Sequence, residues 1–293
     1  MVDAKLVGEL RAMTGAGMMD CKKALTEANG DMEAAVDYLR EKGIAKSAKK
    51  AERIAAEGLA NIFIKDNEAI IIEVNSETDF VSKNEEFTGM IECIGKTILE
   101  NKVKTVEEAL TLKCTCCDCG TINDLIVAKI SKIGEKLSLR RFEIVKKTKL
   151  ENFGAYLHMG GKIAVLTVIK GADESVAKDV AMQAAAMRPE YLTENDVPKA
   201  VINREKKVLT EEAMNEGKPK DIAEKMVMGR IKKFFTEVCL VNQPFIKDGD
   251  ITVGDYLKNN EGEIKKMIRY EVGEGMEKRS DNFAEEVMNQ VNS

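Results

Sequence analysis

The densest group of reactive side chains in the 293-residue chain is a short run of cysteines. Four thiols fall within six residues, and two of the pairs, Cys114/Cys117 and Cys116/Cys119, have the C-x-x-C spacing typical of soft-metal sites and redox dithiols. A structural zinc site draws its ligands from two separated segments, whereas Cys21, Cys93 and Cys239 are single and scattered along the chain. We therefore expect no second ligand pair beside the run. Its members, which are weak candidates for metal ligands, are Cys114, Cys116, Cys117 and Cys119.

Two interpretations of this cysteine run stay open. One is a thiol-cluster protein that binds a metal or is redox active, with the rest of the chain as its scaffold. The other, more ordinary one is a variable loop before the helix that begins at Thr121.

No other constellation in the sequence is typical of catalysis. His158 is the single histidine, it lies beside a predicted hairpin turn, and no cysteine or serine motif accompanies it. No phosphate-binding glycine motif follows a predicted strand, because Thr14–Gly17 falls between short helices and Gly273-Glu274-Gly275 lacks a third glycine. From the sequence we therefore expect a protein that is not an enzyme and that has neither catalytic residues nor a cofactor.

An aromatic residue in a polar stretch is the most informative single feature. Phe80 follows a predicted strand and has Asp79 beside it. If the ring is exposed, it is a candidate anchor for a protein partner. The alternative is a hydrophobic staple onto the following helix, and the pattern alone favours neither.

Composition and charge exclude several classes of protein. Apolar residues make up 44% and charged residues 32%, which is typical of a soluble globular protein. The longest apolar runs, such as 163–169, are far shorter than the roughly 18 residues of a membrane span, so we expect no membrane association. The N-terminal residues lack an apolar signal segment, so we expect a reducing, cytoplasmic location rather than a disulfide scaffold.

The charge balance argues against nucleic acid as a partner. The net charge is −5, from 45 basic and 50 acidic residues, whereas phosphate binding requires a basic field. The one basic run, 40–53, has no interleaved aromatic residues for base stacking. We interpret it as a solvated helical linker.

Hydrophobic periodicity predicts an α+β protein that begins with a small three-helix bundle. In residues 1–43, Asn29-Gly30 ends the second helix, Asp31 caps the third, and Gly43 follows its end. The predicted divisions are the bundle 1–43, a helical linker 44–57, a first core subdomain 58–145, a second core subdomain 146–192 and 241–280, a helical hairpin 193–240, and a C-terminal helix 281–293.

The two core subdomains are predicted to be related because each begins with a hairpin and continues with a helix. The first hairpin spans 59–74, and capping boxes at Ser82-x-x-Glu85 and Thr121-x-x-Asp124 open its helices. The second spans 154–169 and precedes a helix from Asp173. The insertion at 193–240 is predicted to be an antiparallel helical hairpin, either solvated or in contact with a second copy or another partner.

Several stretches of this sequence resemble the bacterial translation elongation factor Ts family, whose members exchange guanine nucleotide on elongation factor Tu. The resemblance runs in order along essentially the whole chain. It rests on LRAMTGAGMMDCKKAL at 10–25, EVNSETDFV at 73–81, GKPK at 217–220, QPF at 243–245 and RYEVGEG at 269–275. The cysteine run is not part of the family pattern.

The resemblance implies a fold and a set of contact residues. It implies that the N-terminal bundle is ubiquitin-associated (UBA)-like and that the helical hairpin is a dimerisation arm, so that a homodimer is expected. The partner is elongation factor Tu, through its GTPase domain and a second surface. The contacts implied are the Mg²⁺-dislocating loop of Thr78, Asp79, Phe80 and Val81, the bundle residues Met18, Met19 and Lys22, and His158 in the second subdomain.

Overall fold

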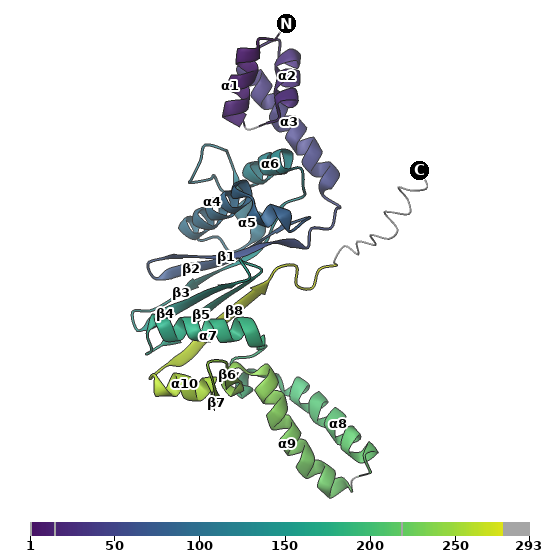
Figure 1. Ribbon diagram of the computed structural model, residues 1–293, viewed down its shortest axis with the longest axis vertical. Helices are drawn as coiled ribbons and strands as arrows, with labels where there is room; N and C mark the ends of the chain where they lie inside the picture. The colour runs from purple at the N-terminus through teal and green to yellow at the C-terminus, as the bar shows by residue number, and fades with distance from the viewer. Residues whose placement is uncertain (1, 15, 218, 278–293) are drawn as a thin grey trace. The chain divides into compact units, whose positions relative to one another are not determined.

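The computed structural model describes residues 2–14, 16–217 and 219–277. Helices and strands are mixed along the chain, in agreement with the predicted α+β class (Figure 1). The chain divides into two compact units. The first comprises Met1–Ile64, Ala69–Ile144 and the segment from Tyr270 onward, and the second comprises Lys65–Glu68 and Val145–Arg269. The predicted C-terminal helix 281–293 lies outside the described residues.

The first unit begins with three helices, α1 (Ala4–Thr14), α2 (Met18–Glu27) and α3 (Met32–Lys50). The cap predicted for the third helix is confirmed, since the Asp31 carboxylate accepts a hydrogen bond from the Ala34 amide at 2.8 Å. The helices bury a small core of their own. Its fully buried members are Leu10, Cys21, Ala24, Leu25 and Ala35.

The predicted end of the third helix at Gly43 is wrong, because α3 continues to Lys50. Gly43 is a contact point rather than a cap: a Cβ there would lie 3.5 Å from the Val127 side chain on α6 (Ile122–Ile133). That distance is an ordinary van der Waals contact, so the packing of α3 on α6 leaves room for a small side chain here. The Arg40 guanidinium strengthens the same contact with an ion pair to Asp124 at 2.8 Å.

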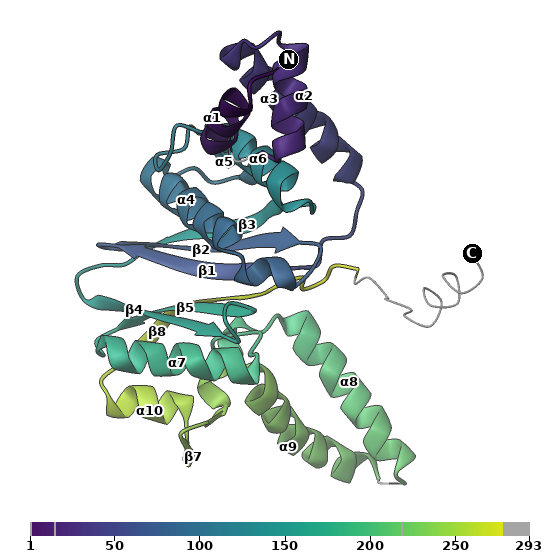
Figure 2. The ribbon, with the colours of Figure 1, turned by 45° about the horizontal axis from the view of Figure 1, so that its top comes forward.

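The first sheet has the strand order β1-β2-β3, with β1 at Glu57–Lys65, β2 at Glu68–Ser76 and β3 at Ser138–Lys146. Between β2 and β3 the chain forms α4 (Glu85–Asn101), α5 (Val106–Thr111) and α6, which cover one face of the sheet (Figure 2). The capping box predicted at Thr121 is confirmed. The short helix α5 was not predicted from the sequence.

The second sheet has the order β4-β5-β8, with β4 at Glu151–His158, β5 at Ile163–Lys170 and β8 at Glu263–Glu271. Strands β4 and β5 are antiparallel, and α7 (Glu174–Met187), the helix predicted to start from Asp173, packs on them with Asp173 as its cap. Gly154 makes this packing possible, since a Cβ there would lie 1.9 Å from the Ala177 carbonyl oxygen.

The remaining elements of the second unit lie between α7 and β8 in sequence. Helices α8 (Lys199–Asn215) and α9 (Lys220–Val238) pack against each other, as the predicted helical hairpin requires. A two-stranded ribbon, β6 (Pro244–Phe245) and β7 (Asp248–Thr252), and helix α10 (Val253–Asn259) follow. Both sheets therefore consist of two consecutive strands and a third that returns after intervening helices, as the repeated order of elements suggested.

A buried carboxylate joins three segments of the first unit. The Glu73 side chain on β2 is fully buried and accepts hydrogen bonds from Arg140 Nη1 at 2.8 Å and Arg141 Nε at 2.6 Å on β3. It also accepts bonds from the Gly273 amide at 2.9 Å and from Asn75 Nδ2 at 3.2 Å. Burying an ionised carboxylate away from water is costly unless cations and hydrogen-bond donors surround it in this way.

Substitution of Glu73 by Gln should destabilise the first unit strongly. Breaking a buried ion pair from one side costs about 3–5 kcal/mol, because the remaining charges stay desolvated. Urea unfolding followed by circular dichroism measures the loss. Glu92→Gln is the matched control, since the Glu92–Lys96 pair on α4 is exposed and its removal should leave the transition unchanged. Equal effects of the two substitutions would contradict the role assigned to Glu73.

Candidate functional site

A short loop leaves the buried strand β2 and enters a single 3-10 turn, η1 (Phe80–Lys83), before α4 begins. The predicted capping box at Ser82 is wrong: the cap of α4 is Asn84, whose side chain accepts a hydrogen bond from the Glu86 amide at 2.8 Å. Ser82 belongs to η1, and its hydroxyl donates to the Asp79 carbonyl at 2.5 Å. The loop from Thr78 to Val81 is thus a separate element rather than a frayed helix end.

Carboxylates of the first unit fix the backbone of this loop. Glu135 accepts hydrogen bonds from the Thr78 amide at 2.9 Å and from its hydroxyl at 2.6 Å. Glu77 accepts one from the Lys136 amide at 2.6 Å and forms an ion pair with Arg53 at 3.3 Å. Bonds to ionised groups are stronger than neutral ones, so the loop is held in one conformation.

The two hydrophobic residues of the loop point in opposite directions. Val81 is only 6% exposed and belongs to the core of the first unit, whereas Phe80 is 83% exposed. The alternative of a hydrophobic staple is therefore wrong, since the ring does not pack on α4. Asp79 is exposed as well, and its carboxylate has no hydrogen-bond partner among the residues that the structure describes.

The bundle residues that the resemblance implied share one face of α2. Met18, Met19 and Lys22 are all exposed, while the buried residues of that helix begin at Cys21. Exposed methionines are adaptable apolar contacts and are common on binding surfaces. Met13 at the end of α1 is also exposed.

His158 lies in the second unit, at the last position of β4. Its ring stacks on Tyr156, with the ring centroids 6.0 Å apart and the Tyr156 hydroxyl 3.5 Å from Nδ1. Leu157 and Met159 beside it are exposed apolar residues. These two residues were not predicted as contacts, although hydrophobic residues at a hairpin turn are the signal that could have identified them.

The cysteine run forms a closed loop between α5 and α6. An antiparallel β-bridge between Lys113 and Thr121 closes the loop, and Cys117 and Cys119 are joined by a disulfide. No second ligand pair was expected beside the run, and the structure brings one single cysteine there: the sulfur atoms of Cys93, Cys114 and Cys117 all lie within 4.8 Å of one another. Cys93 belongs to α4, and the helix brings it under the loop.

The environment of these thiols does not favour nucleophilic chemistry. Burial, together with a hydrogen bond to Cys116, raises the pKa of Cys93 to about 12. Burial is also the largest effect on Cys114, whose pKa is raised. A reactive cysteine needs a lowered pKa, so neither thiol is activated for attack.

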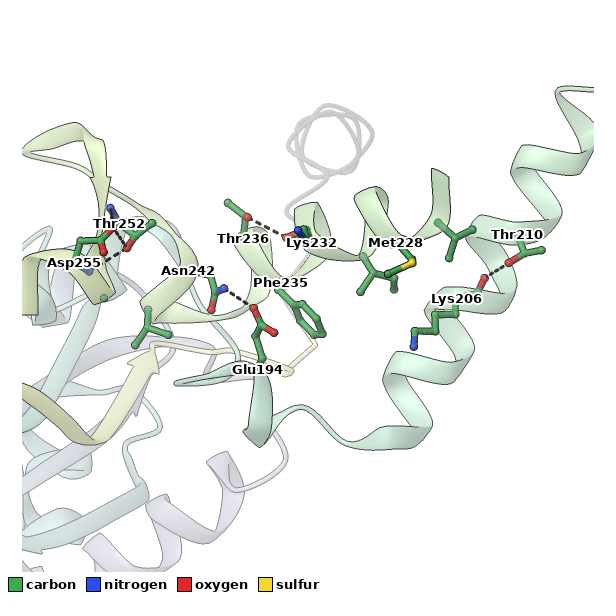
Figure 3. Close-up of a pocket in the computed structure, with 14 residues that line it drawn as sticks. Glu194, Lys206, Thr210, Met228, Lys232, Phe235, Thr236, Asn242, Thr252 and Asp255 are labelled. Atoms are coloured by element: carbon green, nitrogen blue, oxygen red, sulfur yellow. Dashed lines mark hydrogen bonds between the residues drawn. The ribbon is translucent and has the colours of Figure 1, made fainter. Parts of the chain in front are cut away.

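A groove of about 870 Å³ lies in the second unit, between α8, α9 and the segments that follow α9 (Figure 3). Several of its polar groups already form hydrogen bonds with one another. The Asn242 amide donates to the Glu194 carboxylate at 2.7 Å, and the Thr252 hydroxyl donates to the Asp255 carboxylate at 2.7 Å. Its apolar lining offers contact area rather than a catalytic arrangement. That lining includes Val227, Met228, Ile231, Phe235 and Val241.

Three of the six basic residues in the run 40–53 are engaged within the first unit. Arg40 and Arg53 pair with Asp124 and Glu77, and the Lys50 ammonium donates to the Gly134 carbonyl oxygen. Among the described helices, none is both long and apolar enough to cross a membrane.

Comparison with known families agrees with these observations. A family model described as Elongation factor TS matches residues 77–274, which is more than half of the chain. The match includes the loop from Thr78 to Val81 and His158, and it begins after the α2 residues Met18, Met19 and Lys22. The chain therefore belongs to the elongation factor Ts family, whose role is in translation elongation.

Proposed function

We propose that this protein is a guanine-nucleotide exchange factor. It binds elongation factor Tu in the GDP-bound form, displaces the Mg²⁺ ion and promotes the release of GDP, so that GTP can bind. The observation that carries this proposal is the 83% exposure of Phe80 on a loop whose backbone is fixed by hydrogen bonds. Family membership supplies the partner.

The loop acts as a wedge in this proposal. Phe80 enters between two helices of the partner's GTPase domain, and Asp79 helps to displace the helix that supports the bound Mg²⁺. A rigid loop loses little conformational entropy on binding, so more of the contact energy is available to deform the partner. No covalent step is needed, and the protein acts by binding rather than as an enzyme.

Exchange follows from the coupling of two binding equilibria. If the protein binds nucleotide-free Tu more tightly than GDP-bound Tu, GDP must bind the complex more weakly by the same factor. Each tenfold loss of GDP affinity requires about 1.4 kcal/mol of differential binding. Displacing Mg²⁺ removes the largest charge that neutralises the phosphates, so a small movement has a large effect.

Further contacts support the bound state in the same proposal. Met18, Met19 and Lys22 on α2 contact the GTPase domain, and His158 contacts a second surface of Tu. The exposure of the two methionines, and of Leu157 and Met159 around His158, gives both surfaces apolar area to bury.

The domain divisions are part of the proposal. The three N-terminal helices form a UBA-like domain, and α8 and α9 form an arm through which two copies of the chain associate. Apolar residues on these two helices remain exposed, as an interface requires. They are Val208 and Met214 on α8, and Ile222 and Met228 on α9.

Substitution of Phe80 by Ala should slow the release of GDP from Tu that this protein promotes, without affecting the fold. We expect the acceleration of GDP release to fall about 30-fold or more, because loss of a central aromatic anchor costs about 2 kcal/mol or more. Stability should not change, since the ring is exposed. Release of fluorescent GDP from Tu measures the effect. Ile64→Ala, at an exposed apolar site of the same unit, is the control. A release rate equal to that of the unsubstituted protein would refute the wedge.

Substitution of Glu135 by Gln should loosen the loop while leaving Phe80 in the sequence. Losing the charged acceptor of Thr78 costs about 1.5 kcal/mol or more, so the Thr78 amide should exchange hydrogen about tenfold faster. Hydrogen-exchange mass spectrometry detects this change, and nucleotide release should slow in parallel. Glu107→Gln, at an exposed position on α5, should change neither. Unchanged protection at Thr78 would show that Glu135 does not hold the loop.

Substitution of Met228 by Glu should weaken self-association of the chain. Met228 is 71% exposed on α9, and a charge buried in an apolar interface is costly. Sedimentation velocity should show a shift from dimer to monomer, with secondary structure unchanged. Leu150→Glu is the matched control, because Leu150 is 70% exposed and lies outside α8 and α9. A monomeric unsubstituted protein, or a dimer unaffected by Met228→Glu, would contradict the proposed arm.

A further inference from the structure

Nucleotide exchange as proposed makes no use of the five cysteines gathered in the first unit. One of them, Cys93, comes from α4, and the other four come from the loop between α5 and α6. The sulfur atoms of Cys93, Cys114 and Cys117 lie within 4.8 Å of one another. Two separated segments thus supply the thiols, which is the arrangement a structural metal site requires.

Hydrogen bonds that involve no sulfur hold the loop against α4. The Thr115 amide donates to the Thr97 hydroxyl at 3.1 Å, and the two hydroxyls lie 3.2 Å apart. Thr97 is fully buried and lies one helical turn after Cys93. The Cys114 amide closes the loop with a bond to the Gly120 carbonyl at 2.9 Å. The thiols are therefore brought together before any ion binds.

The distances suit a tetrahedral thiolate site. With Zn–S bonds of about 2.3 Å, four sulfur atoms around zinc lie about 3.8 Å apart, so the three sulfurs need to move only slightly. Two further sulfurs are available for the fourth position. Cys116 Sγ lies 3.9 Å from the Cys93 carbonyl oxygen, and Cys119 is joined to Cys117.

We propose that Cys93, Cys114 and Cys117, with Cys116 or Cys119 as the fourth ligand, bind a Zn²⁺ ion when the Cys117–Cys119 disulfide is reduced. Four thiolates in tetrahedral geometry select zinc among the common divalent ions. Two molecules of a small thiol supply the two electrons and two protons of the reduction and leave as their own disulfide. Each ligand thiol then loses its proton when the metal binds. The ion enters from solvent, since Cys116 and Cys117 are exposed.

Metal titration of the full-length protein tests the site. Protein reduced with a small thiol and desalted without oxygen is titrated with Co²⁺ and then with Zn²⁺. We expect the intense thiolate-to-cobalt absorption of a tetrahedral site, its loss on addition of about one Zn²⁺ per chain, and a rise in melting temperature. Oxidised protein, with the disulfide intact, should bind neither ion tightly.

Single substitutions locate the ligands. Cys93→Ser and Cys114→Ala should each weaken Zn²⁺ binding about a hundredfold or more, since even outer-shell changes cost 10–100-fold. Cys114 is only half-buried in a loop, so its variant remains informative if the Cys93 variant fails to fold. Whichever of Cys116→Ala and Cys119→Ala shows the larger loss identifies the fourth ligand.

The two cysteines outside the cluster serve as controls. Cys21→Ala and Cys239→Ala remove buried free thiols and should leave zinc affinity unchanged. Absence of tight Zn²⁺ binding by the reduced protein, or full affinity in the folded Cys114→Ala variant, would overturn the proposal. The readout is metal binding and does not depend on the proposed exchange activity.

Discussion

A carboxylate removed from water must find ionic partners and hydrogen-bond donors, and Glu73 meets this requirement with Arg140, Arg141 and the Gly273 amide. The partners come from β3 and from a segment 200 residues away in sequence. Gly273 has a positive φ of 72°, and a Cβ there would lie 2.1 Å from the Ala56 carbonyl oxygen, so only glycine can bring its amide to the carboxylate. This interaction ties β2 to β3 and to the segment that carries Gly273.

The exposed loop depends on that fixed strand. Five residues after Glu73, Thr78 is bound by Glu135, and Val81 anchors the following turn in the core. Phe80 between them contributes nothing to the stability of its own unit, because its ring is in solvent. An exposed aromatic ring lowers solubility. Because this ring lies on a rigid loop, it can bind a partner without reorganisation.

The cysteine loop shows a second use of the same scaffold. Thr97 holds the loop on α4 through hydrogen bonds to Thr115 that involve no sulfur atom. The loop also precedes the cap of α6 at Thr121, and α6 carries the Asp124 that pairs with Arg40 of α3. A site at this loop therefore bears on the packing of α3 and α6 rather than on the loop that carries Phe80.

Sequence alone determined the features that depend on neighbours within a few residues: the caps at Asp31 and Thr121, the start of a helix near Asp173, the β-hairpins of both sheets, and the two helices of the helical hairpin. Tertiary structure decided the rest. It made Gly43 a contact instead of a helix end, left Phe80 in solvent, and set Cys93 beside a loop more than twenty residues away. Periodicity and capping record local hydrogen bonding and burial, whereas these three outcomes depend on which surfaces meet after the chain has folded.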